Sequence, residues 1–99
     1  MKYSFHPEAE KELNMAISYY NESKNGLGLE FAREVYLAIQ NIIAFPLAWS
    51  QLSTNTKRFL INRFPYGVIY QIANEEILII ALMHLNREPG YWEKRIKNV

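Results

Sequence analysis

The residue types that could do chemistry are concentrated in one short segment near the end of the sequence. Within twelve residues stand a histidine, two arginines and two aromatic residues, which we call the C-terminal cluster: His84, Arg87, Tyr91, Trp92 and Arg95. Arginine can hold a phosphate through two parallel hydrogen bonds, and aromatic rings can stack on bases. Histidine and tyrosine can transfer protons. The cluster therefore indicates a surface for an anionic partner, with or without catalysis.

Basic residues also precede the C-terminal cluster in the second half of the chain. Three of them are Lys57, Arg58 and Arg63. Residues 1–56 contain four Lys or Arg against six Glu, a balance of −2, and residues 57–99 contain seven against four, a balance of +3. The net charge of the whole chain is only +1, too small for a generic nucleic-acid-binding protein. We expect the basic residues of the second half to line a cationic groove, with Arg63 and Arg87 near one end of a sheet.

Each of these residues also has a purely structural interpretation. His84 could accept a hydrogen bond from a neighbouring backbone group, and Arg58 could be a solvated residue at a sheet edge. Tyr91 and Trp92 could pack the end of the chain onto a sheet, because aromatic rings bury a large apolar area. Two distant histidines, with no cysteine or aspartate in the sequence, offer no metal-ligand set, so we expect neither a metal ion nor another cofactor.

Length and composition predict one globular domain over residues 1–99. Two separate cores of about 50 residues each would be close to the lower limit for unaided folding. Hydrophobic residues make up 49% of the sequence and charged residues 21%, which is a globular composition. The longest apolar run is far short of the roughly 20 residues that span a bilayer, and the first residues lack the apolar core of a signal peptide. We therefore expect a cytoplasmic protein with no membrane partner.

The first half of the chain has the periodicity of a short strand followed by two helices. Residues 2–6 alternate as in a strand, and Pro7 suits the first turn of a helix. Apolar residues then recur at helical spacing until about residues 21–23. A turn at residues 25–28 leads to a second helical stripe from Phe31 to Phe45, which Pro46 ends. A short connection of this kind predicts an antiparallel helical hairpin.

The second half changes to the period of strands. Residues 47–56 have no clear period, and residues 57–63, 66–73 and 76–83 are rich in Ile, Val, Phe and Tyr, as strands are. Their short connections dictate antiparallel pairing. The element order β-α-α-β-β-β predicts an α+β fold, with a four-stranded antiparallel sheet, the helical hairpin packed on one face and a C-terminal tail.

The ordered set of motifs resembles the RelE/ParE superfamily of toxins from type II toxin–antitoxin modules. The resemblance covers about residues 2–95. It rests on Phe5-His6-Pro7-Glu8-Ala9-Glu10, Tyr19-Tyr20, Gly26-Leu27-Gly28 with Phe31, Arg63-Phe64-Pro65-Tyr66 with Ile69-Tyr70, and His84-x-x-Arg87-x-Pro89-x-Tyr91-Trp92-x-x-Arg95. The Phe-Pro-Tyr and Tyr-Trp motifs are closest to the ParE-like, or plasmid-stabilisation, branch. The resemblance implies the same fold and a cognate antitoxin that neutralises the protein.

The resemblance implies two competing mechanisms of growth inhibition. ParE-like members bind and poison DNA gyrase, which is the mechanism we favour slightly. RelE-like members are metal-independent endoribonucleases that cleave mRNA on the ribosome. For that alternative, the candidate catalytic residues are Arg63, His84, Arg87 and Tyr91; the arginines would stabilise the phosphate as a 2′-hydroxyl attacks it, and His84 or Tyr91 would move protons. Candidate binding residues in either case are Lys57, Arg58, Trp92 and Arg95. A third alternative is an inactive relative that serves only as a DNA-autoregulatory partner.

Overall fold

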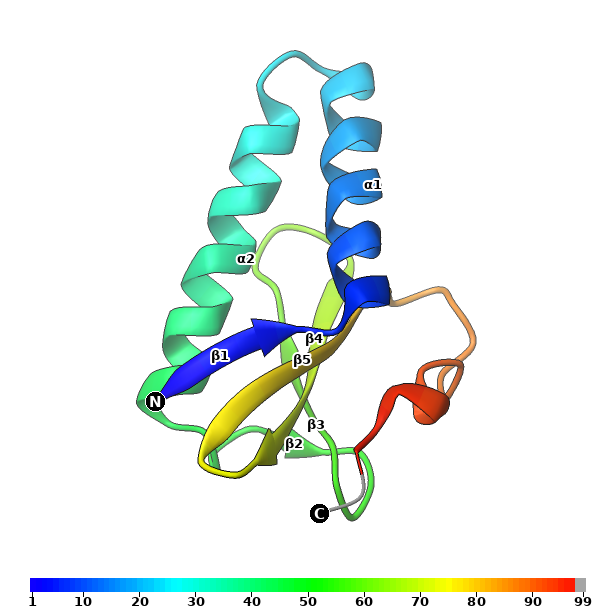
Figure 1. Ribbon diagram of the computed structural model, residues 1–99. Coiled ribbons are helices and arrows are strands. Elements are labelled where there is room, and N and C mark those ends of the chain that lie inside the picture. Colours follow the sequence, from blue (N-terminus) through cyan, green and yellow to red (C-terminus); the bar gives the residue numbers. More distant parts are fainter. Residues whose placement is uncertain (98–99) are drawn as a thin grey trace.

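The structure is a computed structural model that describes residues 1–97, and it has one sheet with a helical hairpin on one face (Figure 1). The elements in chain order are β1 (Lys2–Phe5), α1 (Pro7–Ser23), α2 (Leu27–Ala44), β2 (Ser50–Gln51), β3 (Lys57–Leu60), β4 (Tyr66–Ala73), β5 (Glu76–His84) and a 3-10 turn, η1 (Glu93–Arg95). The predicted α+β class and the helical hairpin are confirmed. Figure 1 shows the hairpin extending beyond the sheet at one end of the molecule.

The sheet differs from the prediction in two details. It has five strands in the order β1-β5-β4-β3-β2, and β1 pairs with β5 in parallel, so the predicted four-stranded antiparallel sheet is wrong on both points. The extra strand, β2, is only two residues long, which is too short for the alternating pattern that predicts a strand. β1 and β5 are separated in the chain by both helices and the three other strands, so no tight turn dictates their relative direction. A two-residue turn, by contrast, joins β4 to β5 and enforces antiparallel pairing.

The main core lies between the hairpin and one face of the sheet. Phe31, Ile42, Val68, Tyr70 and Ile79 have 2% or less of their surface exposed there. The hydroxyl of Tyr70 donates a 2.6 Å hydrogen bond to the carbonyl oxygen of Pro46, and burial raises the pKa of this phenol to about 12. That bond ties the loop after α2 to the middle of the sheet.

The second face of the sheet is covered in part by the end of the chain. Trp92 is 4% exposed and packs with Ile69, Ile80 and Met83. Near residue 97 the buried side chain of Gln71 exchanges two hydrogen bonds with the backbone of Lys97. The interpretation of Trp92 as a packing anchor is therefore confirmed, and the segment after β5 is a structural layer.

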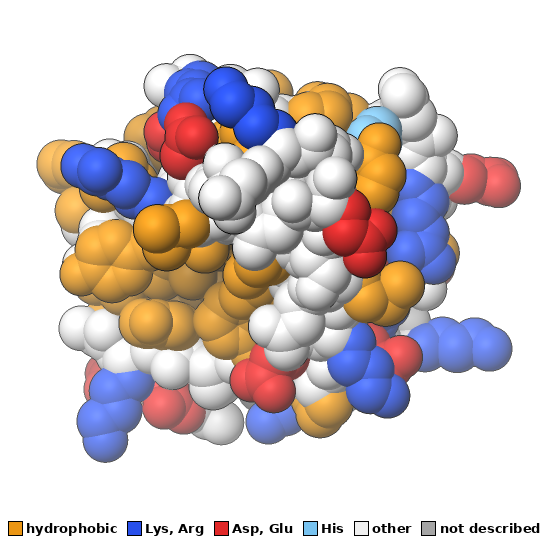
Figure 2. All heavy atoms as spheres, turned by 90° about the horizontal axis from the view of Figure 1, so that it is seen from above, with side chains coloured by type: hydrophobic (Ala, Val, Ile, Leu, Met, Phe, Trp, Pro, Cys, Tyr) orange, Lys and Arg blue, Asp and Glu red, His pale blue; other side chains and the backbone are white. Residues whose placement is uncertain are grey.

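Several large hydrophobic side chains remain exposed on the helices. Met15 and Tyr19 on α1 and Leu29 and Tyr36 on α2 are each more than half exposed. Seen from the hairpin end, hydrophobic side chains gather around a hollow on the side of the molecule where α2 lies (Figure 2). No helix within residues 1–97 is long and apolar enough to cross a membrane.

The close approach of the two helices depends on Gly28. Its N–H donates a 2.8 Å hydrogen bond to Oδ1 of Asn21, and a Cβ at this position would collide with the carbonyl oxygen of Ile17 and with the Asn21 side chain. Two residues earlier, Gly26 has a φ of 86° but open space around it. Steric room is therefore needed at Gly28 and conformational freedom at Gly26.

We expect Gly28→Ala to lower the free energy of unfolding by about 1–3 kcal/mol, because the helices must move apart to admit the methyl group. Urea denaturation followed by circular dichroism measures this change. Gly26→Asn is the matched control, since asparagine tolerates a left-handed backbone, and it should lose less than Gly28→Ala. Equal losses at the two positions would contradict the close-packing argument.

Candidate functional site

The candidate site is built on the edge of β5 that extends beyond the short strand β1. β1 covers β5 only from Glu76 to Ile79, and the last bond along this edge runs from the His6 N–H to the Ile79 carbonyl oxygen at 2.9 Å. Next comes a bulge, because Ile80 has no partner in β4 while its neighbours pair with Tyr70 and Ile69. From Ile80 onward, no strand within residues 1–97 covers this edge of β5, so its backbone groups need other partners.

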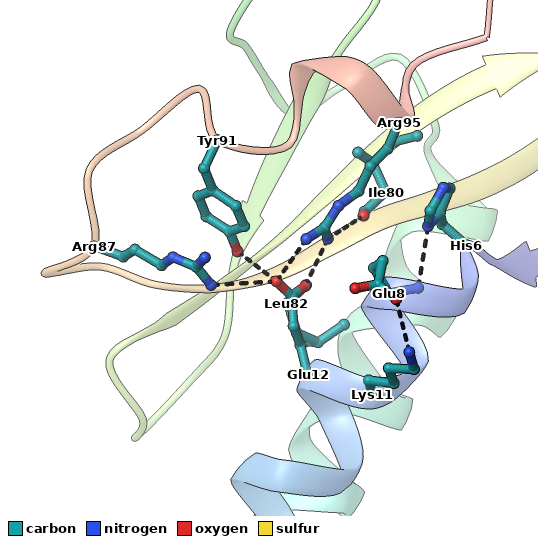
Figure 3. A network of polar contacts seen from close by, with 9 residues as sticks. All are labelled: His6, Glu8, Lys11, Glu12, Ile80, Leu82, Arg87, Tyr91 and Arg95. Carbon is teal, nitrogen blue, oxygen red and sulfur yellow. Dashed lines mark hydrogen bonds and ion pairs between the residues drawn. The ribbon is translucent and has the colours of Figure 1, made fainter.

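An ion pair takes the place of the missing strand. Oε1 of Glu12, on α1, accepts a hydrogen bond from the Leu82 N–H at 3.1 Å, and Nη1 of Arg95 donates to the Ile80 carbonyl oxygen at 3.0 Å. The two side chains also bind each other through two parallel bonds of 2.9 and 3.1 Å. Each is 14% exposed. One carboxylate and one guanidinium thus bind two backbone groups of the β5 edge and fasten the tail to α1 (Figure 3).

Two more members of the C-terminal cluster converge on the same carboxylate. The Tyr91 hydroxyl donates a 2.9 Å hydrogen bond to Oε2 of Glu12, and Nη1 of Arg87 lies 3.4 Å from that oxygen. The Arg87 guanidinium also stacks on Tyr91, with its central carbon 3.5 Å from the ring centroid. In Figure 3, Arg87, Tyr91 and Arg95 approach Glu12 from the tail side while Glu12 rises from α1. This group of four residues is the Glu12 network.

The network holds Tyr91 in its protonated form. Burial raises the pKa of the Tyr91 phenol well above its ordinary value near 10, and the hydrogen bond and negative charge of Glu12 raise it further. The nearby arginines oppose this effect only in part. The phenol is therefore a hydrogen-bond donor at neutral pH and is not poised to accept a proton.

Glu12 is the residue that the sequence reasoning missed. It is one of three glutamates in the first two turns of α1, where negative charge generally favours a helix N-terminus. A signal was nevertheless present: Glu12 follows Ala9 by three residues and precedes Ala16 by four, and both alanines are buried. A carboxylate beside the buried face of a helix needs a cation or a hydrogen-bond donor as its partner. The second half of the sequence contains several residues of both kinds.

The other members of the C-terminal cluster lie close to this network in different surroundings. Nδ1 of His84 accepts a hydrogen bond from the Asn86 N–H at 3.0 Å, as the structural interpretation of this residue expected. This bond leaves Nε2 to carry the proton in the neutral ring. The ring stands edge-on to Tyr66, 5.1 Å away. Trp92 is turned into the second core.

The three basic residues predicted to complete a groove are engaged elsewhere. Arg63, whose φ is 72°, donates to Glu30 at 2.8 Å and lies 3.9 Å from Glu34, both on α2. Its hydrogen bond lowers the pKa of Glu30. The ammonium group of Lys57 lies 3.4 Å from a backbone carbonyl oxygen. Arg58 runs across Gly67, where a Cβ would be 3.1 Å from its Cγ.

The arrangement can bind and orient an anionic or polar partner through Arg87, the half-exposed member of the network. Among residues 1–97 no group of three or more His, Cys, Asp or Glu side chains could hold a metal ion. The side chains beside this network that are able to move or hold protons are His84 and Tyr91, and Tyr91 keeps its proton.

Comparison with known proteins identifies the family. The sequence profile described as "ParE toxin of type II toxin-antitoxin system, parDE" matches residues 3–89. The chain belongs to this family of toxins. The match agrees with the ParE-like resemblance of the sequence motifs and favours it over the RelE-like one. Membership of a toxin–antitoxin system also implies a cognate antitoxin as partner.

One solved structure shows that the toxin shares its fold with a protein of low sequence identity. It is the chromosomal ParDE TA system from P. aeruginosa, with a TM-score of 0.76 and 13% sequence identity. The superposition covers 87% of this toxin and 97% of that chain. The comparison with curated protein sequences gives no match.

We expect Glu12→Gln to release the tail of the toxin, because a neutral amide leaves the mostly buried Arg95 without its counter-charge. The free energy of unfolding should fall by about 1–3 kcal/mol. The fluorescence of Trp92 should shift to longer wavelength, and protease cleavage near residue 90 should become faster. Glu10→Gln is the matched control, since Glu10 is exposed on the same helix. A Glu12→Gln toxin as protease-resistant as this control would contradict the role of the network.

We expect Tyr91→Phe to change how stability depends on pH. Because the pKa of Tyr91 is raised by folding, the unfolded chain loses this proton first as the pH rises above about 10. The stabilisation is therefore complete below pH 10 and declines above it. Denaturation at a series of pH values from 8 to 11.5 should show a shallower decline for Tyr91→Phe than for the unmodified toxin. Identical slopes would show that folding does not raise the pKa of Tyr91.

Proposed function

We propose that this toxin inhibits growth by binding DNA gyrase and that it does so without cleaving RNA. The observation that carries this proposal is that the side chains of the Glu12 network already bind one another. Three residues suited to phosphate chemistry (Arg87, Tyr91 and Arg95) share one carboxylate. Membership of the ParE family supports the same choice.

A nuclease site of this kind needs a base to activate the 2′-hydroxyl and free cations at the phosphate. Tyr91 is a poor base because its proton is held by Glu12 and its pKa is raised. Arg95 is 14% exposed and already bonds to Glu12 and to Ile80. The Glu12 carboxylate also offsets the positive potential that would attract a phosphate. The geometry therefore supports a protein-binding surface better than an assembled catalytic site.

The binding surface would consist of the loop between β5 and η1 together with Arg87. This segment is fastened by Glu12 at one side and by Trp92 at the other, so it presents its exposed side chains in a fixed arrangement. A preformed surface loses little conformational entropy on binding. Arg87 lies flat on Tyr91 with half of its side chain exposed, which is a suitable geometry for contact with a carboxylate of the target.

The decisive experiment compares two activities of the same purified toxin. One assay follows supercoiling of relaxed plasmid by gyrase, and the other follows codon-linked cuts in a translated message by primer extension. We expect inhibition of supercoiling and intact messages. Cuts in the message with normal supercoiling would overturn the proposal in favour of the nuclease, and neither effect would indicate an inactive relative.

We expect Arg87→Ala to weaken gyrase inhibition at least tenfold while the melting temperature changes little, because the residue is half exposed and its bond to Glu12 is long. Arg33→Ala is the control, since Arg33 is exposed on α2 and lies outside the proposed surface. His84→Gln should preserve most of the inhibition. Trp92→Ala should lose activity only in proportion to its loss of stability. If Arg87→Ala behaved in the same way, the target-binding surface would have to lie elsewhere on the toxin.

A further inference from the structure

One face of α2 is exposed along the whole helix and carries almost no charge. Its residues follow one another at helical spacing and so lie on one side of the helix. We call this set of exposed residues the α2 stripe: Leu29, Arg33, Tyr36, Leu37, Gln40 and Ala44. Leu29 is 74% exposed and Tyr36 is 56% exposed. Since a surface helix usually presents charged and polar residues to water, a stripe with a single charge, that of Arg33, is unusual for a free surface.

The apolar surface continues from the α2 stripe toward the sheet. The two glutamates beside the stripe turn to that flank, where Glu30 and Glu34 face Arg63 at 2.8 and 3.9 Å. A hollow of about 480 Å³ lies between α2 and β3 on this flank, with Leu37 and Leu60 among its lining residues. Leu60 is itself more than half exposed. In Figure 2 hydrophobic side chains gather on the side of the molecule where α2 lies, so the stripe is part of a broader apolar patch.

The α2 stripe is complementary to a second copy of itself when the two helices run antiparallel. A two-fold axis that passes between positions 36 and 37 sets Leu29 opposite Ala44 of the second copy. The same axis sets Arg33 opposite Gln40 of the second copy, and the aromatic and aliphatic residues at 36–37 meet their own equivalents at the centre. Each residue of the stripe thus has an apolar or hydrogen-bonding partner. Two-fold pairs of this self-complementary kind are the commonest assembly of identical chains.

The single charge of the stripe distinguishes the two directions in which the helices could pair. In the antiparallel pair each Arg33 faces a neutral amide, whose oxygen can accept a hydrogen bond from the guanidinium. The two arginines are then about 10 Å apart along the helices, beyond the screening length of about 8 Å at physiological ionic strength. In a parallel pair the two arginines would lie directly opposite each other and repel. The charge of Arg33 therefore favours the antiparallel pair.

We propose that the toxin, free of other partners, forms an antiparallel homodimer through the α2 stripe. One helix face, about 27 Å long and about 10 Å wide, is smaller than the roughly 800 Å² that each partner contributes to a standard interface. The dimer therefore exchanges with monomers at micromolar concentrations. Figure 1 shows the segment after β5 on the opposite side of the molecule from α2, so the dimer leaves that segment uncovered. The proposal is independent of the proposed function.

Sedimentation velocity of the purified free toxin, over about 1–300 μM, tests the proposal. The average mass should rise with concentration from that of one chain, 11.7 kDa, toward that of two. Leu37→Glu and Tyr36→Glu should each weaken the dimer at least tenfold, because each variant places two like charges at the centre of the interface. Both side chains are exposed, and circular dichroism checks that the variants are folded.

Gln40→Glu tests the direction of pairing. In the antiparallel pair each new carboxylate faces Arg33 of the second copy, so the dimer should become about threefold tighter. Because these ion pairs are exposed at the rim, the gain should disappear at high salt. In a parallel pair the new carboxylates would face each other and weaken the dimer, which would overturn the antiparallel arrangement.

Met15→Glu is the matched control, because Met15 is an exposed apolar residue of α1 outside the α2 stripe. It should dimerise as the unmodified toxin does. A toxin that is monomeric at every concentration would overturn the proposal. So would a dimer that persists undiminished in both Leu37→Glu and Tyr36→Glu, since its interface would then lie elsewhere.

Discussion

The carboxylate of Glu12 provides the constraint on which the second half of the structure depends. β5 is longer than the strand β1 beside it, and its pairing with β4 has a bulge at Ile80, so backbone groups from Ile80 onward have no partner strand on the β1 side. A buried edge of this kind is costly unless every donor and acceptor finds a partner. Glu12 and Arg95 supply two of these partners, one for the Leu82 N–H and the other for the Ile80 carbonyl oxygen. The tail is therefore held on the sheet through β5 backbone groups that no neighbouring strand pairs.

This constraint also determines what the cationic tail can do. Arg95 is bound to the sheet edge and to Glu12, and the Tyr91 phenol donates its proton to Glu12 and has a raised pKa. Only Arg87 combines membership of the network with substantial exposure. The same cluster of residue types that suggested catalysis in the sequence thus becomes, in the folded toxin, a rigid support with one cation presented at its surface.

The hairpin contributes the complementary half of this arrangement. α1 carries Glu12 to the β5 edge, and the contact of α1 with α2 is made possible by the absence of a side chain at Gly28. Further along the same flank, Met15 and Tyr19 extend the row that Glu12 begins. One helix face therefore serves the fold at one end, through Glu12, and leaves Met15 and Tyr19 exposed at the other.

Local patterns in the sequence were enough to determine the α+β class, the helical hairpin with its turn, and the strands β4 and β5, because helical and strand periods and turn residues act over short distances. The ordered motifs also indicated the toxin family. The parallel placement of β1, the two-residue strand β2 and the ion pairs that bind Arg63 to α2 and Arg87 to α1 were decided by tertiary structure. So was the role of Glu12, which meets Arg95 across 83 residues of chain. Sequence spacing carries no information about such a contact. The contact depends on which backbone N–H and carbonyl groups of β5 are left without a partner by the bulge and by the short strand β1.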